Sequence, residues 1–127
     1  MIYIAHAAHG NHLNLDILEP HGERTYVFGR WDSPANDPAA MMVKAREVLK
    51  DFDFAEDYFV SVGGDPLAAA MCMIALTDMS IDKSAGGFNW LRYERPRPAI
   101  DDRPEVLARY TPVHVRFDPA AAEAEGT

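Results

Sequence analysis

The stretch "YFVSVGGDPLAAAMCMIAL", residues Tyr58–Leu76, decides the fold, because it passes from an apolar segment through two glycines into a long apolar helix. A compact run of aromatic and β-branched residues before glycines predicts a central strand buried on both faces. Asp65 is placed to cap the following helix, and Pro66 suits its first position, where a missing N–H costs nothing. The stretch therefore predicts a strand over Asp57–Gly64 and a heavily buried helix over Asp65–Ile81.

This unit is extended by a strand that follows the helix and by a second helix that comes earlier in the chain. "FNWLRYERP" (Phe88–Pro96) is typical of a strand, so a right-handed parallel crossover from the first strand through the helix is expected. "NDPAAMMVKAREVLKDF" repeats the Asp-Pro helix start, with Asp37 as the cap. Its apolar residues fall on one side, which predicts an amphipathic helix lying on a core: Met41, Ala45, Val48, Leu49 and Phe52.

The remaining segments supply the outer strands. β-Rich runs predict strands at Ile2–Ala7 and Arg24–Trp31, and the alternation in "VHVRFD" predicts an antiparallel edge strand at Val113–Asp118. "NHLNLDILEP" is compatible with a strand or a short helix, and both readings stay open. One helical turn is predicted near Glu105–Ala108, between prolines.

Together these elements predict an α/β protein with a single small mixed sheet of about five strands. A parallel βαβ core, two main helices and an antiparallel C-terminal edge strand make up this sheet and its cover. Residues 1–118 are expected to form one domain, and the small, acidic residues 119–127 to be a disordered tail.

Composition excludes several classes of protein. The net charge of −8 argues against a duplex-binding surface, which needs a basic excess to displace counterions. Cys72 is the only cysteine, so no intramolecular disulfide can form. The amino terminus lacks the pattern of a signal peptide, and no apolar run approaches the ~20 residues of a membrane span. We therefore expect no membrane association and a cytoplasmic location.

Gly63, Gly64 and Asp65 form the first candidate site, because glycines between a strand and a helix often hold a phosphate. Neither G-x-x-x-x-G-K-[ST] nor G-x-G-x-x-G is present, so a P-loop is excluded. The Asp65 carboxylate would fill the anion position with its own charge. A structural turn is the favoured interpretation, and a nucleotide or anion site is the alternative, since ligands gather beyond the carboxyl ends of parallel strands.

Histidines near the amino terminus form the second candidate site. His6, His9 and His12 are spaced by three residues and could meet a metal ion such as zinc. The spacing matches no specific zinc motif, so ordinary polar histidines at a strand end are the favoured interpretation.

Aromatic and basic residues lie together in the strand predicted at Phe88–Pro96. Trp90, Arg92, Tyr93 and Arg95 could stack on single-stranded nucleic acid. Such residues are also common at protein interfaces, and core packing accounts for part of the set.

The order "DYFVSVGGDPLAAAMCMIAL" then "FNWLRYER" resembles small accessory proteins of tailed bacteriophages. In that family an Asp-Tyr strand leads through Gly-Asp-Pro to an alanine-rich helix, and then to a Leu-(Lys/Arg)-(Trp/Tyr)-(Asp/Glu)-Arg strand. The resemblance covers Asp57–Arg95, and Gly63 is an addition to the simpler pattern. It implies a phage or prophage origin and an accessory role, and it carries no functional residues across.

No specific catalytic constellation is present, so the preferred hypothesis is a non-enzymatic phage accessory protein without a cofactor. Its partner would be a bacterial protein of the cytoplasm, in a host-takeover or anti-defence role, or a phage protein. A homodimer paired along the edge Val113–Phe117 also stays open. The alternatives are a nucleotide- or metal-binding α/β module or enzyme at the Gly63–Gly64–Asp65 turn, and a single-strand nucleic-acid binder.

Overall fold

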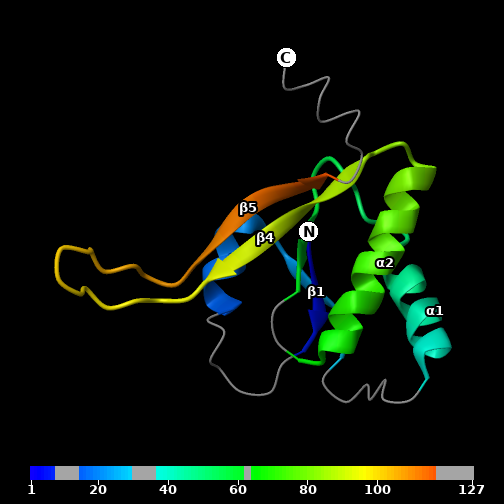
Figure 1. Ribbon diagram of the computed structural model, residues 1–127. Helices are drawn as coiled ribbons and strands as arrows, with labels where there is room; N and C mark the ends of the chain where they lie inside the picture. Colours follow the sequence, from blue (N-terminus) through cyan, green and yellow to red (C-terminus); the bar gives the residue numbers. More distant parts are fainter. Residues whose placement is uncertain (8–14, 30–36, 62–63, 117–127) are drawn as a thin grey trace.

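The computed structural model describes residues 1–7, 15–29, 37–61 and 64–116 (Figure 1). Within them the strands form one five-stranded sheet, in the order β2-β1-β3-β4-β5. β5 runs antiparallel to β4, and the other neighbours are parallel. The predicted mixed sheet with an antiparallel C-terminal edge strand is therefore confirmed. In chain order the elements are β1 (Ile2–His6), the 3₁₀ helix η1 (Leu15–His21), β2 (Arg24–Phe28), α1 (Pro38–Leu49), β3 (Tyr58–Val60), α2 (Pro66–Asp82), β4 (Gly87–Glu94) and β5 (Arg109–Arg116).

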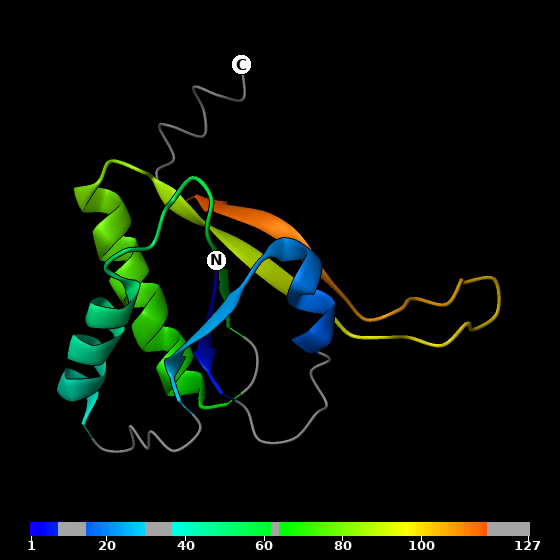
Figure 2. The same cartoon turned by 180° about the vertical axis from the view of Figure 1, so that it is seen from behind.

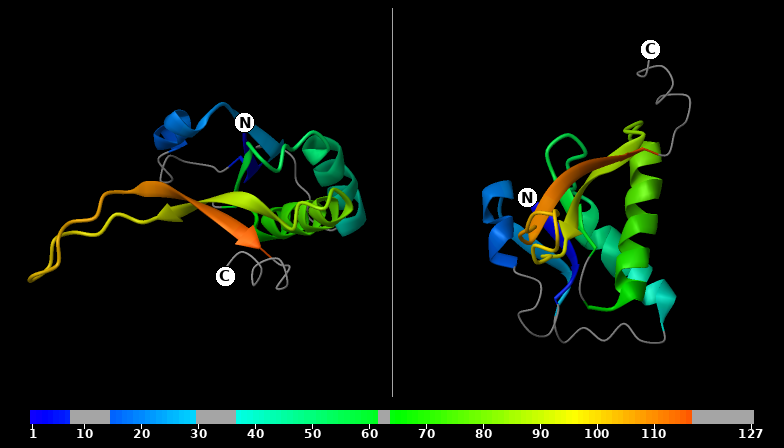
Figure 3. Two further views of the ribbon diagram at one scale, coloured as in Figure 1. Left: turned by 90° about the horizontal axis from the view of Figure 1, so that it is seen from above. Right: turned by 60° about the vertical axis from the view of Figure 1, so that its left-hand side comes forward.

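The helices cover both faces of the sheet (Figures 2 and 3). α1 and α2 lie together on one face, over a core that includes Tyr3, Phe59 and Phe88. η1 lies on the other face, over a second core that includes Ile4 and Leu91. The connection from β1 to β2 runs one way across the sheet, and the connections through α1 and α2 run the other way. Right-handed crossovers that run in opposite directions end on opposite faces, as these do.

Both helices begin as their sequences predict. The Asp37 carboxylate accepts the Ala40 N–H at 3.1 Å, and Pro38 opens α1. The Asp65 carboxylate accepts the Leu67 N–H at 2.9 Å, and Pro66 opens α2. Each carboxylate thus satisfies one of the N–H groups that a helix start leaves unpaired.

Burial follows the predicted face of α1 but only one side of α2. Met41, Ala45, Leu49 and Phe52 are buried, and Val48 packs against them. In α2 the side with Ala68, Cys72 and Leu76 is buried, whereas Leu67, Ile74 and Ile81 are 36%, 46% and 61% exposed. The expectation of a heavily buried helix therefore holds for one side only, because the sheet and α1 cover that side and leave the other side open.

The described part of the segment left open between strand and helix forms the 3₁₀ helix η1, with Leu18 in the core, and its first four residues lie outside the described residues. The helical turn predicted at Glu105–Ala108 is wrong. Val106 exchanges backbone hydrogen bonds with Arg97 at 2.8 and 2.9 Å. These hydrogen bonds between the two halves of the hairpin use the N–H and carbonyl of Val106 that a helical turn would need, so this segment stays extended.

Residues 95–108 form an arm that extends the β4–β5 hairpin beyond the sheet (Figure 1). Two isolated bridges, Arg97 with Val106 and Ile100 with Arg103, hold its two halves together. Asp101 at its tip has a positive φ of 53°, which short polar residues tolerate in tight turns. β5 consequently begins at Arg109, four residues before the predicted strand. The predicted tail, residues 119–127, lies outside the described residues.

Candidate functional site

The candidate site lies where the direction of the sheet reverses. β1 and β3 are parallel neighbours, and the chain leaves them toward opposite edges of the sheet. Open α/β sheets bind ligands beyond the carboxyl ends of such strands, at this switch point. The carboxyl end of β1 is His6, and the segment after β3 leads to Gly64 and Asp65 at the start of α2. Two of the predicted site groups therefore meet there.

His6 is held by the start of α2. Its side chain is 9% exposed, and its Nδ1 accepts the Asp65 backbone N–H at 2.9 Å. A backbone N–H can only donate, so Nδ1 presents its lone pair and the neutral ring carries its proton on Nε2. Nε2 is buried and has no hydrogen-bond partner among the described residues. The site thus contains one oriented donor without a partner in residues 1–7, 15–29, 37–61 and 64–116.

Gly64 allows this contact. Its φ is +66°, and a Cβ at this position would meet Nδ1 of His6 and lie 2.6 Å from the His6 Cβ. Only glycine combines this backbone conformation with so close an approach. Gly64 therefore has a structural role, because its missing side chain leaves room for the imidazole. Gly63 lies outside the described residues.

The predicted histidine metal site is only partly described, because His9 and His12 lie outside the described residues. In the part of the chain that is described, no group of three histidine, cysteine or acidic residues could hold a metal ion. The Nδ1 lone pair of His6 is used by the Asp65 N–H, and Nε2 holds the proton. A metal ion on His6 would therefore require both interactions to change.

The four predicted aromatic and basic residues, three in β4 and Arg95 at the start of the arm, do not share one surface. Trp90 packs beneath α1 and α2, with its ring 6.1 Å from that of Phe59. Tyr93 packs beneath η1, with its ring 5.1 Å from that of Tyr110. Arg92 and Arg95 are exposed. The two aromatic rings serve different cores, so this arrangement gives little support to a stacking platform for nucleic acid.

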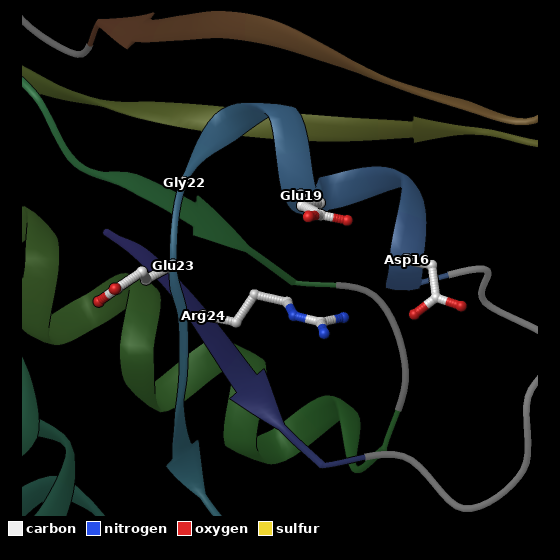
Figure 4. A pocket seen from close by; sticks show the side chains of 5 residues that line it. All are labelled: Asp16, Glu19, Gly22, Glu23 and Arg24. Atoms are coloured by element: carbon white, nitrogen blue, oxygen red, sulfur yellow. The ribbon is translucent and has the colours of Figure 1, made fainter.

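An open depression of about 770 Å³ lies between η1 and β2 (Figure 4). The side chains of Asp16 and Glu19 point toward the space that the Arg24 guanidinium enters, whereas Glu23 points away from it. Arg24 Nη1 donates to the Leu15 carbonyl at 2.9 Å. With three carboxylates and one guanidinium among its lining residues, the depression disfavours anions. Its one guanidinium is already hydrogen-bonded to η1.

The arm was not predicted from the sequence as a functional element. Its residues are exposed apart from the half-buried Val106 and Ala108. Arg97, Pro98, Ile100, Arg103, Pro104 and Val106 line a hollow of about 490 Å³ on it. The available signal was the acidic pair "DD" between two extended, proline-containing runs, which is a turn pattern that points to a hairpin.

Cys72 offers a test of the core. Burial raises the pKa of its thiol to about 12, from 9.0. The folded chain therefore holds a proton that the unfolded chain releases above pH 9, so we expect stability to fall between pH 9 and 12, by up to about 1.4 kcal/mol per pH unit. Denaturant titrations against pH of the wild type and of Cys72→Ala measure this loss. A slope that is equally steep in both proteins would contradict it.

The same burial predicts slow chemistry at the thiol. A disulfide reagent such as DTNB should modify Cys72 at pH 8 rapidly in denaturant and at least about 10³-fold more slowly in the native protein, because the reaction awaits opening of the fold. Equal rates would show that the thiol is accessible in the native protein.

In the described residues, no helix is long and apolar enough to cross a membrane. A protein-family model described as "Phage Pam3 gp32-like protein" matches residues 2–99, from β1 through β4 and into the arm. This match confirms the resemblance to small phage proteins. Neither a search of curated proteins nor a search of solved structures found a significant match.

Proposed function

The chain belongs to the Phage Pam3 gp32-like family, and on this premise we propose that it is a non-enzymatic phage accessory protein that binds a bacterial protein. The binding would take place in the cytoplasm of the infected cell, where it would redirect or block the activity of the partner. No metal or cofactor is part of this proposal.

The arm is the observation that supports the proposal. Ile100 and Leu107 are 58% and 71% exposed on it, and it has no packed face of its own. An isolated two-stranded ribbon is at best marginally stable in water. Contact with a second protein would bury these apolar side chains, which stabilises a complex by roughly 25 cal/mol per Å² of apolar surface.

The hollow on the arm indicates the chemistry of the partner. Its lining combines apolar side chains with the guanidinium groups of Arg97 and Arg103, and no carboxylate is among the lining residues. Arginine pairs well with carboxylates in bidentate geometry. The complementary surface is an apolar side chain flanked by aspartate or glutamate on the bacterial protein.

A second copy of the chain is a less suitable occupant. Pro112 lies in β5 opposite Leu91. Proline has no N–H, so its nitrogen in an edge strand faces the open side, where it removes a donor that an added strand would need. The homodimer paired along β5 therefore has less support than a foreign partner.

Matched serine substitutions test the arm. We expect Ile100→Ser and Leu107→Ser each to weaken partner binding about tenfold or more, as loss of a buried apolar anchor does. Ile81→Ser and Val43→Ser are the controls, because Ile81 and Val43 are 61% and 70% exposed on the helices. Capture from a bacterial lysate would identify the partner, and calorimetry with the purified partner would measure the dissociation constants of all four variants.

Three outcomes would contradict this proposal. One is a partner whose affinity is lost with Ile81→Ser or Val43→Ser and kept with the arm variants. Another is self-association that requires the arm, detected by light scattering during gel filtration. The third is the absence of any protein whose capture depends on Ile100 or Leu107.

A further inference from the structure

We propose that the switch point between β1 and β3 binds an uncharged ligand of the nucleoside class, with a carbonyl or hydroxyl oxygen that accepts a hydrogen bond from His6 Nε2–H. This inference goes beyond protein binding by the arm, and it depends on different residues.

The unpartnered donor is the first argument. His6 is more than nine-tenths buried, and in the part of the chain that the structure describes its Nε2 has no hydrogen-bond partner. Buried donors in native proteins are almost always paired, because leaving one unpaired forfeits its hydration without replacement. The Asp65 N–H fixes the ring from the other side through Nδ1. The donor is therefore oriented before any ligand arrives.

The position of the donor is the second argument. It lies at the carboxyl end of a central parallel strand, where the connections diverge to opposite sides of the sheet. Nucleotide ligands of doubly wound sheets bind in this location. Gly64 keeps the α2 start close to the ring, since a side chain there would occupy the same space as the imidazole.

Charge selects the kind of oxygen. The Asp65 carboxylate accepts the Leu67 N–H and occupies the positive end of the α2 dipole. A phosphate at the same place would meet a carboxylate on a chain whose net charge is −8. A metal ion is disfavoured as well, because Nε2 carries the ring proton. An uncharged oxygen on a base or a ribose satisfies the donor without repulsion.

Nuclear magnetic resonance on ¹⁵N-labelled protein tests the inference directly. The probes are adenosine, cytidine, uridine, adenosine monophosphate and inorganic phosphate. We expect at least one nucleoside to shift the His6 Nε2 signal and the Asp65 amide signal. The monophosphate should bind no more tightly than its nucleoside, and inorganic phosphate should not shift either signal.

Two substitutions separate the donor from its structural contact. His6→Asn retains an acceptor oxygen at the position of Nδ1, and so can keep the Asp65 N–H bond, but it lacks Nε2. We expect it to weaken nucleoside binding about tenfold. Leu107→Ser on the arm should leave the affinity unchanged.

The inference is overturned if no nucleoside shifts the His6 Nε2 signal, if phosphate alone does so, or if His6→Asn binds as tightly as the wild type. Should His6→Asn fail to fold, magnetisation transfer between the Nε2 proton and nucleoside protons in the wild type decides the question. A contact confirms the site, and transfer to a buried water alone rejects it.

Discussion

Phe59→Ala is expected to lower the free energy of unfolding by about 3–5 kcal/mol, the largest loss that a single core truncation produces. Phe59 is fully buried in β3, the central strand of the sheet. Its ring lies 6.1 Å from the rings of both Phe88 and Trp90, in edge-to-face arrangements that add to the burial. β3 has only three residues, so little else in the strand can fill the cavity.

Denaturant unfolding followed by far-ultraviolet circular dichroism measures this loss. Tyr26→Ala is the matched control, because it removes an aromatic ring that is 38% exposed on the edge strand β2. Its cost should stay near or below about 1 kcal/mol, in the range of exposed positions. Similar costs for Phe59→Ala and Tyr26→Ala would show that the Phe59 ring contributes no more to stability than an exposed ring does.

The elements that were predicted correctly are those that local patterns specify. Asp-Pro before an apolar run is a helix start that depends only on adjacent residues, and α1 and α2 both begin at it. The apolar run of β3 identified a strand in the middle of the sheet, and the alternation in β5 identified an edge strand. Exposure follows the alternation only in part, because Val113 is 40% exposed on the face predicted to be apolar.

The arm was missed because long-range pairing holds it. Arg97 and Val106 each donate a backbone hydrogen bond to the other's carbonyl. No side-chain periodicity records that pairing in a ribbon exposed on both faces. The apolar and acidic residues near Glu105 suggested a helical turn, but hydrogen bonds across the hairpin overrode that weak local preference.

The sequence identified the residues of the candidate site as two separate groups, and it did not predict that His6 and Asp65 are in contact. His6 was singled out as a metal ligand, and Gly64 with Asp65 as a turn. Residues 6 and 65 are 59 positions apart, and their hydrogen bond depends on β1 and β3 being neighbours. The sequence alone shows neither this strand order nor the side of the ring that faces the helix, so the free donor at Nε2 was not foreseen.

Gly64→Ala is expected to cost about 2–5 kcal/mol, from two sources. A non-glycine residue in the left-handed region costs roughly 1–2 kcal/mol, and forcing side-chain atoms into a packed site costs typically about 1–3 kcal/mol more. Both apply at Gly64, since φ is +66° and the added Cβ would overlap the His6 imidazole. The imidazole must then move, which breaks the bond from the Asp65 N–H.

Gly86→Ala separates these two sources, because Gly86 has nearly the same φ, +71°, and a Cβ there would meet no atom within 4 Å. It should cost only the backbone part, about 1–2 kcal/mol. The difference between the two variants in denaturant unfolding then measures the contact of Gly64 with His6. In addition, Gly64→Ala should shift the His6 ring signals, and Gly86→Ala should leave them in place. Equal costs and unchanged ring signals in both variants would mean that His6 does not rest on Gly64, and the donor at Nε2 would then lose the contact that orients it.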